Sequence, residues 1–347
     1  LVNADRGSSW RNIGGGRTAF SLPELAEIAA QNHHIFKELQ YLSNIDYKPI
    51  RYISFAHDEE TYKALEASKA WSKAEMIAPK QFREEISPYF NANPKKYISA
   101  LVSEDCWQAT PGKVVDLVRN LGIAAGGTVM EDCRVLEACR EGKYTSVLVQ
   151  THDKKYVEYR TEHFVNALGS GAGKLCDSMG IDAGLYPVRH QAFITRRLPM
   201  LGKHGTNLDM LIDRQDYKGF SAVYGQQIAY TGQIIGCASP KLDAMRIDKN
   251  LKVNTKAFLE IVSEMFSEWI PDLAGVGIQA VWAGYYTEPR YIVDPELGLF
   301  VGMCGHGFML SQYIARMYVD KLLGRPVPEY FEKLKLNGPG LSEKAFK

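Results

Sequence analysis

Residues 299–310 read LFVGMCGHGFML and decide the fold class. The apolar run Leu299–Cys304 predicts a β-strand, residues 305–307 (GHG) predict a tight turn, and Met309–Leu323 predicts a helix that ends before Gly324. In such a unit the glycines let a ligand approach the backbone, and the N–H groups at the start of the helix face that ligand. The segment therefore indicates a site for a phosphorylated or redox cofactor.

A second unit of the same kind lies at residues 162–178. The apolar stretch 162–167 predicts a strand that runs into the turn LGSGAG at 168–173 and then into a helix. Either set of glycines, taken singly, is explained by ordinary turn geometry. The inference of a cofactor site therefore rests on the presence of both units and on their order in the chain. Between the two units, residues 183–275 contain many short β-rich stretches and a helical segment at 255–269. They predict an antiparallel sheet inserted into an α/β protein.

The composition is that of an ordinary globular chain whose ligand is a small molecule. The 347 residues are 46% hydrophobic and 23% charged, with a formal net charge of +1, and the length suggests about two domains. Basic residues are scattered, which argues against a nucleic-acid-binding stripe or a polybasic membrane patch. The six cysteines form no CxxC pair. This spacing argues against a zinc site or a disulfide framework and favours a reducing compartment.

Six segments, in a defined order, carry a resemblance to one family. They are RNIGGGR at 11–17, the helix from Pro111 with the strand at 127–135, FVNALGSGA at 164–172, PVRHQ at 187–191, WAGYY at 282–286 and GMCGHGFML at 302–310. In these segments the chain resembles the D-amino-acid oxidase-like FAD-dependent oxidoreductases, the group that contains glycine oxidase and the sarcosine oxidase β subunits. The last two are similar to the patterns W-A-G-L-R and G-x-x-G-H-G-F and are the most specific.

The resemblance implies an α/β fold with an α+β insert, namely a Rossmann-like FAD-binding domain and an antiparallel-sheet substrate domain. We expect the FAD-binding domain at 1–44, 98–182 and 276–335, the substrate domain at 45–97 and 183–275, and a tail at 336–347. The GxGxxG motif with its following acidic residue, which binds the ADP part of FAD in this family, is absent from the sequence. We therefore expect the first βαβ unit to be lacking and to come from an N-terminal peptide or another subunit, in a hetero-oligomer.

The resemblance also implies which residues bind FAD. The expected cofactor-binding residues are Arg11, Asn12, Gly16, Arg17, Val135, Ala167, Gly169, Gly171, Gly305, Gly307, Phe308 and Met309. Reduced flavin gains negative charge, which the N–H groups at the start of the helix after Gly305 are placed to stabilise. Ala283 or Gly284 stands where monomeric sarcosine oxidase has a flavin-tethering cysteine, so we expect non-covalent FAD. No metal site is expected.

The implied reaction transfers a hydride from the substrate carbon beside nitrogen to flavin N5 and leaves an imine that water hydrolyses. The expected substrate is a small amine or amino acid. The expected catalytic residues are His306, Tyr286 and Arg290, and the expected substrate-binding residues are Tyr224, Tyr285, Arg189 and His190. Tyr286 stands at the arginine of W-A-G-L-R, so Arg290 or Arg189 is expected to bind a substrate carboxylate.

Several alternatives stay open. Related folds oxidise C–O bonds, so a 2-hydroxy acid or glycerol phosphate is an alternative substrate. A non-catalytic subunit of a flavoprotein complex is an alternative from another class. His306 either bonds to flavin or substrate, or holds its own loop by contacts with the backbone. We expect a cytoplasmic protein, with peripheral attachment to a membrane through partners as the alternative.

Overall fold

The computed structural model describes most of the chain. The described residues are 7–91, 95–198, 201, 207–214, 220–228, 231–240, 251, 255–289, 291–341 and 343. Arg290, one of the expected catalytic residues, lies outside them. Within the described ranges, none of the helices has the length and apolar character needed to cross a lipid bilayer. The expected cytoplasmic location stays a prediction.

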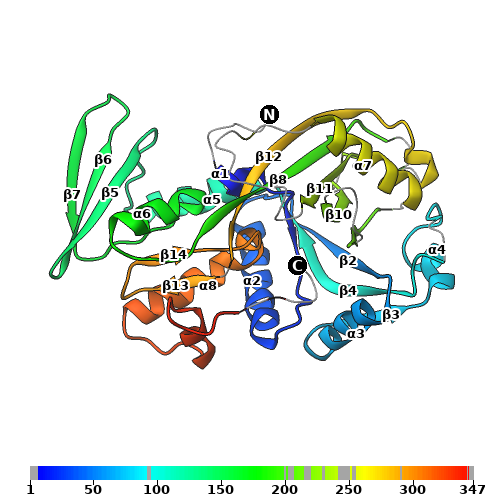
Figure 1. The fold of residues 1–347 in the computed structure, drawn as a ribbon, viewed down its shortest axis with the longest axis horizontal. Coiled ribbons are helices and arrows are strands. Elements are labelled where there is room, and N and C mark those ends of the chain that lie inside the picture. The colour runs from blue at the N-terminus through cyan, green and yellow to red at the C-terminus, as the bar shows by residue number, and fades with distance from the viewer. Residues whose placement is uncertain are drawn as a thin grey trace.

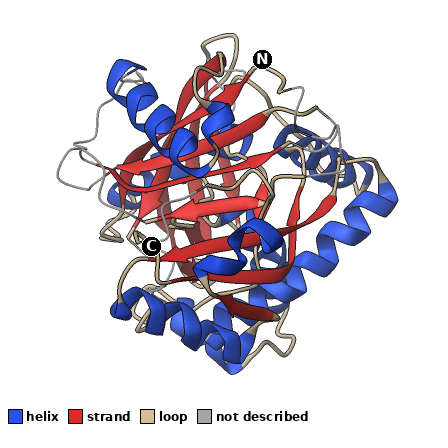
Figure 2. Ribbon diagram, turned by 90° about the vertical axis from the view of Figure 1, so that its right-hand side faces the viewer, coloured by secondary structure: helices blue, strands red, loops and turns tan. Residues whose placement is uncertain are grey.

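A nine-stranded sheet occupies the centre of the molecule, with helices on its outer sides (Figure 2). In spatial order its strands are β1 (Gly15–Gly16), β4 (Ser99–Gln108), β2 (Lys48–Ala56), β9 (Met210–Asp213), β10 (Phe220–Gln227), β11 (Ile234–Pro240), β8 (Tyr186–Thr195) and β12 (Ile278–Glu288), with β3 (Ala74–Ile77) also on β4. The pair β2–β9 is parallel, whereas the other described pairings are antiparallel. The sheet is therefore mixed, and the parallel pair joins the early strands to the late ones.

Helix α7 (Thr255–Trp269) packs on this sheet. Its buried apolar residues recur at helical spacing and form one stripe: Phe258, Ile261, Val262, Met265, Phe266 and Trp269. Phe266 contacts Phe193 of β8 edge to face, and Trp269 lies against Phe55 of β2. This helix, predicted at 255–269, covers the core between β2 and β8.

Shorter helices and turns complete the fold. They are α1 (Gly7–Arg11), α3 (Glu59–Ala67), α4 (Phe82–Glu85) and the 3-10 turns Ser68–Trp71, Pro79–Gln81, Gly169–Gly171, Pro271–Leu273 and Glu329–Leu334. Asp58 precedes helix α3 as its N-cap, and its carboxylate accepts a hydrogen bond from Thr61 N.

Helices α2 (Pro23–Leu42) and α8 (Gly307–Leu322) pack side by side next to the hairpin of β13 (Ile292–Asp294) and β14 (Leu299–Val301) (Figure 1). A proline at its first position suits the start of α2. Asn32 joins the two helices, because its Oδ1 accepts from Tyr313 N at 2.9 Å and its Nδ2 donates to Gln312 at 3.2 Å. The α2–α8 pair therefore fixes the start of α8, where the predicted glycine turn lies.

The two strand–turn–helix units predicted from the sequence lie side by side. Of the predicted strand at 162–167, Asn166 forms a parallel bridge to Leu299. Its N–H donates to Gly298 O at 2.7 Å, and its carbonyl accepts from Phe300 N at 3.0 Å. The helix of this unit is α6 (Ala172–Ser178). Because the two segments run parallel, both glycine turns lie at the same edge.

A separate antiparallel sheet of β5 (Arg134–Glu141), β6 (Tyr144–Gln150) and β7 (Tyr156–Thr161) lies at the left of Figure 1, after helix α5 (Pro111–Ala124). Within the predicted strand at 127–135, regular pairing begins only at Arg134. Strands β4 and β12, expected in the FAD-binding domain, pair inside the nine-stranded sheet, so this sheet crosses the expected boundaries at 98 and 276. The expected α/β class is confirmed, and the domain boundaries stay a prediction.

Candidate active site

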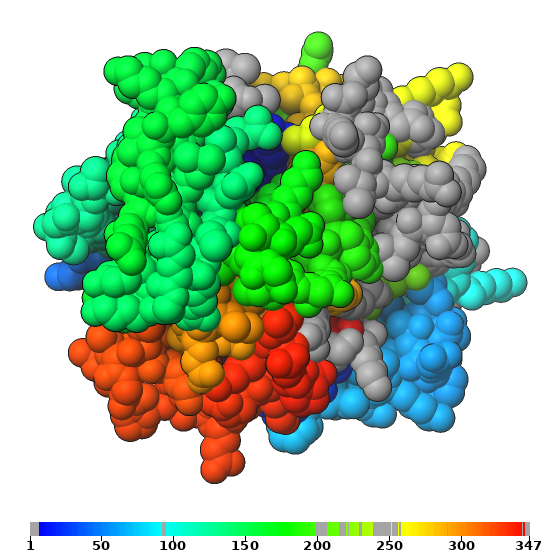
Figure 3. Space-filling view, turned by 60° about the vertical axis from the view of Figure 1, so that its left-hand side comes forward, coloured from blue at the N-terminus to red at the C-terminus, as the bar shows by residue number. Residues whose placement is uncertain are grey.

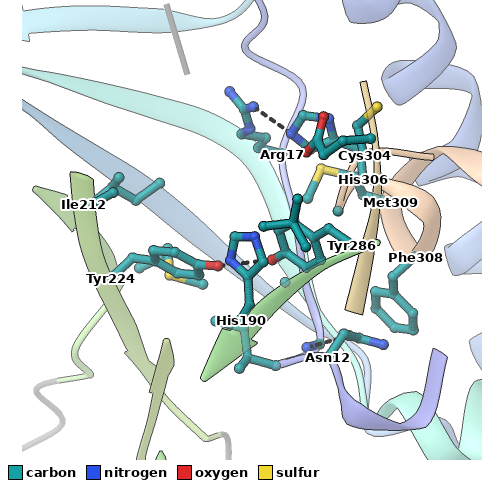
Figure 4. A pocket seen from close by; sticks show the side chains of 18 of the residues that line it. Asn12, Arg17, His190, Ile212, Tyr224, Tyr286, Cys304, His306, Phe308 and Met309 are labelled. Atoms are coloured by element: carbon teal, nitrogen blue, oxygen red, sulfur yellow. Dashed lines mark hydrogen bonds between the residues drawn. The ribbon is translucent and has the colours of Figure 1, made fainter. Parts of the chain in front are cut away.

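A cavity of about 450 Å³ lies where the large sheet meets two glycine-containing segments (Figure 4). Its size is within the range of roughly 300–1,000 Å³ that is usual for small-ligand sites. One wall comes from the sheet, and the other from residues 12–17 and 304–309. The lining residues are Asn12, Ile13, Gly14, Gly15, Arg17, Tyr52, Tyr186, Val188, His190, Met210, Ile212, Arg214, Ala222, Tyr224, Tyr286, Glu288, Pro289, Cys304, Gly305, His306, Phe308 and Met309.

Strand alternation selects which side chains reach the cavity. Gly15 of β1 has no side chain to orient; the other lining residues from the strands have even numbers: 52 on β2, 186, 188 and 190 on β8, 210 and 212 on β9, 222 and 224 on β10, and 286 and 288 on β12. Successive side chains of a strand point to opposite faces. Arg189 and Tyr285, which are paired across β8 and β12, therefore face away, and these two expected substrate-binding residues do not line the cavity.

Four polar residues that no sequence motif indicated line the cavity, among them Tyr186 at the start of β8. Arg214 follows β9 directly and continues the even series of Met210 and Ile212. Glu288 lies two residues after Tyr286 on β12, and Tyr52 comes from β2. Period-two counting along each strand would have found Arg214 and Glu288. The position of Tyr52 depends on how distant strands pair.

The glycine turn after β14 packs directly on Tyr286. Gly305 has a φ of +78°, and a Cβ atom there would lie 2.2 Å from Tyr286 Cε2. Both the backbone conformation and the available space therefore require glycine. Cys304 N donates to Thr287 O at 3.1 Å and ties the turn to β12. Beyond the turn, the first residues of α8 bring Phe308 and Met309 to the cavity.

His306 is held on both sides of its ring. Its Nε2 lies 3.3 Å from an Arg17 nitrogen, and its Nδ1 lies 2.5 Å from the Tyr291 hydroxyl oxygen. A guanidinium group only donates, so Nε2 accepts and the neutral ring carries its proton on Nδ1. Nδ1 then donates to Tyr291. Both nitrogens thus contact side chains of other segments, and the two alternatives for His306 stay predictions.

Arg17 is a buried cation beside this turn. Its guanidinium donates to Ala19 O at 2.9 Å and lies 4.2 Å from the centre of the Phe20 ring. Burial lowers the pKa of Arg17, and the nearby carboxylate of Glu343 opposes that shift. Glu343 is itself buried and accepts hydrogen bonds from Ser21 N. Glu343 lies in the expected tail at 336–347, where no periodic pattern signalled this contact.

Neutral polar side chains form much of the sheet wall (Figure 4). The hydroxyls of Tyr224 and Tyr286 lie 2.9 Å apart, and the His190 ring stacks on Tyr286 with 3.6 Å between ring centres. Burial lowers the pKa of His190 to about 3 and raises the pKa of both tyrosines. All three are therefore uncharged near neutral pH. His190 and Tyr224, expected to bind substrate, do line this cavity.

The glycine-rich segment before α2 is fastened to the large sheet at two points. Arg11 is hydrogen-bonded to β12 through its side chain and through its carbonyl. Gly16 lies against Trp107, where a Cβ atom would come within 2.2 Å of the indole ring. These two expected cofactor-binding residues hold the segment in place, whereas Asn12 and Arg17 of the same segment line the cavity.

The other expected cofactor-binding residues fall into two groups. Gly305, Phe308 and Met309 line the cavity, and Gly307 is the first residue of α8 beside them. A second group lies away from the cavity, around the bridge at residue 166 and the three-stranded sheet: Val135, Ala167, Gly169 and Gly171. The structure therefore brings four of these eight residues to the cavity or beside it and leaves the other four away from it.

Solved structures share this fold. L-proline dehydrogenase from P. horikoshii matches with a TM-score of 0.75 and 23% identity, over 96% of this chain and 90% of that chain. Glycine oxidase from Geobacillus kaustophilus matches with a TM-score of 0.76 and 17% identity, over 96% and 89%. Dithionite-reduced L-α-glycerophosphate oxidase from Mycoplasma pneumoniae, with FAD bound, matches with a TM-score of 0.67 and 14% identity, over 93% and 86%. No curated protein matches the sequence.

The fold is the α/β fold that these solved structures share. The DAO model, described as FAD dependent oxidoreductase, matches residues 2–321, and the chain belongs to this family. The resemblance inferred from the motifs is thus confirmed, and so is FAD as the cofactor of the family. Non-covalent attachment stays a prediction.

The residues around the cavity fit a flavin ring. Residues 12–15 and the turn at Gly305 present backbone, which lets a flat ring approach closely. Arg17 and the N-terminal end of the 16-residue helix α8 favour negative charge. Reduction adds negative charge to a flavin, so this end of the cavity suits a redox-active ring.

Proposed function

We propose that the protein is an FAD-dependent dehydrogenase or oxidase that breaks the C–H bond beside nitrogen in a small amine or amino acid. The observation that carries this proposal is the cavity, in which Arg17 and Arg214 supply positive charge and His190, Tyr224 and Tyr286 supply uncharged hydrogen-bonding groups. When bound, FAD accepts the hydride, and the protein supplies orientation and electrostatics.

Two sets of residues would hold the flavin ring. They are Asn12, Gly14 and Gly15 on one segment and Gly305, Phe308 and Met309 on the other. The dipole of α8 and the charge of Arg17 would stabilise the negative charge of the reduced ring. Apolar side chains in the lining, including Ile13 and Met210, exclude water and so strengthen these electrostatic interactions.

The expected catalytic residues take different roles in this proposal. Tyr286 contacts the substrate space as a neutral hydroxyl, fixed by its hydrogen bond to Tyr224. His306 holds the glycine turn on Arg17. Arg290 lies outside the described residues, so the proposal does not depend on it. The protein thus orients the substrate and takes no proton through these groups.

A second candidate is oxidation of a C–O bond. Arginine matches the carboxylate of a 2-hydroxy acid or a phosphate as well as it matches an amino acid, and one similar structure is a glycerophosphate oxidase. The structures named for proline and glycine support the C–N bond instead. The two candidates differ in whether the substrate needs a nitrogen.

The test is an absorption spectrum of the purified protein, followed by anaerobic mixing with candidate substrates. The panel is glycine, sarcosine, L-proline, D-alanine, L-lactate and glycerol 3-phosphate, with a dye acceptor for steady-state rates. We expect a flavin spectrum that an amino acid bleaches. Bleaching by lactate or glycerol 3-phosphate alone would assign the C–O reaction. A protein that lacks flavin when purified with all its partners would be the non-catalytic subunit.

We also propose that a βαβ unit, from an N-terminal peptide or another subunit, completes the FAD site in a hetero-oligomer. Asn166 directs its backbone N–H and C=O to β14, so those of Val165 and Ala167 point to the opposite side. There they make no hydrogen bond within the described part of the chain. Such an edge is a template for another strand. Val165 and Leu168 add apolar surface, at 44% and 45% exposure.

Native mass spectrometry of the purified holoprotein tests this second proposal. We expect the 38.9 kDa chain to travel with FAD and a second polypeptide, and to lose FAD when the two separate. A 38.9 kDa species that retains FAD by itself would contradict the proposal. The proposed reaction would be unaffected by that result.

A further inference from the structure

The segment at 336–341, which lies in the expected tail, packs against the core beside the glycine turn. Leu336 N donates to Asp294 Oδ2 of β13 at 3.4 Å. Leu341 is only 3% exposed and packs in the same apolar cluster as Phe20. The segment therefore has a fixed place in the fold, and it runs toward the residues that follow β1.

Glu343 is a buried carboxylate next to this segment. Its side chain is 1% exposed, and its two oxygens accept hydrogen bonds from Ser21 N at 3.2 and 3.0 Å. A carboxylate is costly to bury unless it is hydrogen-bonded and close to positive charge. The cations near Ser21 therefore matter for the stability of this carboxylate.

The guanidinium group of Arg17 lies over the same short stretch of chain. It donates to Ala19 O at 2.9 Å, and it lies 4.2 Å from the centre of the Phe20 ring. The arginine side chain thus folds back along its own segment toward Ser21, the residue that Glu343 contacts. The two charged groups therefore approach residues 19–21 together, although they are far apart in the sequence.

The charge of Glu343 acts on both arginines of the cavity. Burial lowers the pKa of Arg17 and lowers that of Arg214 to about 9, and Glu343 opposes both shifts. The described lining contains these two arginines and one carboxylate, that of Glu288. Glu343 balances the second arginine, so the formal charge of these four described residues is zero.

We propose that Glu343 is the counter-ion of Arg17 and that its negative charge lowers the reduction potential of a flavin ring bound in the cavity. Arg17 lines the cavity and lies 3.3 Å from His306 Nε2 (Figure 4). Reduction adds negative charge to the ring, which Arg17 stabilises and Glu343 opposes. Such effects are strong in an enclosed apolar space. Glu343 is thus a positioning residue that acts through Arg17, and the redox part rests on the proposed function.

The reduction potential of the holoprotein tests this role. It is measured at pH 7 by reductive titration at equilibrium with a reference dye of known potential. Glu343→Gln removes the charge but keeps an oxygen that can accept from Ser21 N. We expect it to shift the two-electron equilibrium toward reduced flavin about tenfold, which is ~30 mV. Glu343→Asp restores the charge and should return the potential toward wild type. Glu329→Gln, at an exposed acid, is the matched control and should not change it.

A double-variant cycle tests the charge contact without a flavin signal. Urea unfolding is compared for wild type, Glu343→Gln, Arg17→Met and the double variant. Each single variant leaves one buried group without its counter-charge, so both should be destabilised. We expect the double variant to have a folding equilibrium constant about tenfold higher than the two single effects combined would give. Arg17→Met combined with Glu329→Gln should show additive effects.

The outcomes separate this inference from the proposed function. A potential that rises in Glu343→Gln and returns in Glu343→Asp, with coupling in the cycle, supports the inference. Additive effects in the cycle would overturn it. A flavin-containing Glu343→Gln protein with the wild-type potential would also overturn it, even if that protein is less stable. A holoprotein without flavin would refute the proposed function, and the cycle would still decide whether Glu343 is the counter-ion of Arg17.

Discussion

The core beneath α7 and the surface around residue 166 differ in how fully their apolar side chains are covered. In the core beneath α7, Phe193 and Trp269 are buried between the large sheet and the helix. On the other side, Val165 and Leu168 are nearly half exposed, beside a strand edge that is open within the described residues. Figure 3 shows that side, where the green atoms of the three-stranded sheet lie above the orange atoms of β13 to α8.

The difference bears on the proposal that additional polypeptide completes the FAD site. Burial of apolar surface contributes about 25 cal/mol per Å² to stability. The buried side chains beneath α7 already contribute this free energy. The exposed residues on the other side gain it only when something covers them. The exposed surface around residue 166 is where the proposed additional polypeptide would gain this free energy.

Removing a large core side chain should have the largest effect. Trp269→Ala leaves a cavity under α7, and we expect the free energy of unfolding in urea to fall by about 3–5 kcal/mol. Leu168→Ala, on the exposed side, is the control and should change it by no more than about 0.5 kcal/mol. Equal losses of unfolding free energy at the two positions would show that burial does not distinguish these two regions.

Gly305→Ala should have the next largest effect. The substitution combines a φ of +78° with a collision against Tyr286, and we expect a loss of about 3 kcal/mol in unfolding free energy and weaker FAD binding. Gly324 has a φ of +69° and open space around it, so Gly324→Ala should cost only about 1 kcal/mol. Equal losses of unfolding free energy in Gly305→Ala and Gly324→Ala would show that close packing on Tyr286 contributes nothing to stability.

Acid should destabilise the protein through two buried histidines. Burial lowers the pKa of His190 to about 3 and that of His33, which stacks on Trp107, to about 4. The unfolded chain therefore binds more protons below the ordinary histidine pKa of about 6.5, and stability is lost as pH falls through that range. From pH 7 to pH 5 each histidine should cost about 2 kcal/mol.

Urea unfolding at pH 7, 6 and 5 measures this loss. We expect His190→Phe and His33→Phe each to remove about half of it, and the double variant to remove most of it. If the unfolding free energy falls with pH as steeply in both variants as in wild type, groups other than these histidines cause the acid sensitivity.

A charge at the open strand edge should have the smallest effect on stability. Val165→Asp is expected to change the unfolding free energy of the chain by no more than about 0.5 kcal/mol. It should nevertheless abolish co-purification of the second polypeptide in native mass spectrometry, because the buried charge would lack a partner. Tyr156→Asp, at a residue that is 66% exposed on β7, is the control. Association that survives Val165→Asp would remove this edge from the interface.

Local patterns made much of the fold predictable. Helices α2, α7 and α8 and the turn at Gly305 depend on residues a few positions apart, such as a proline at the first turn or apolar residues three and four apart. The ordered motifs likewise predicted the family that the comparisons confirmed. Short-range spacing is fully written in the sequence, so no distant contact was needed for these predictions.

The tertiary structure decided which residues line the cavity. The sequence by itself determined the glycine turn, the helix after it and the cofactor class. It did not determine that the charges of Arg17 and Glu343 act on Arg214, or that Arg189 faces away. These facts depend on the parallel pairing of β2 with β9 and on the register of β8 with β12. The physical reason is that strand pairing joins residues far apart in the chain, and a shift of one residue would have exchanged the two faces of each strand.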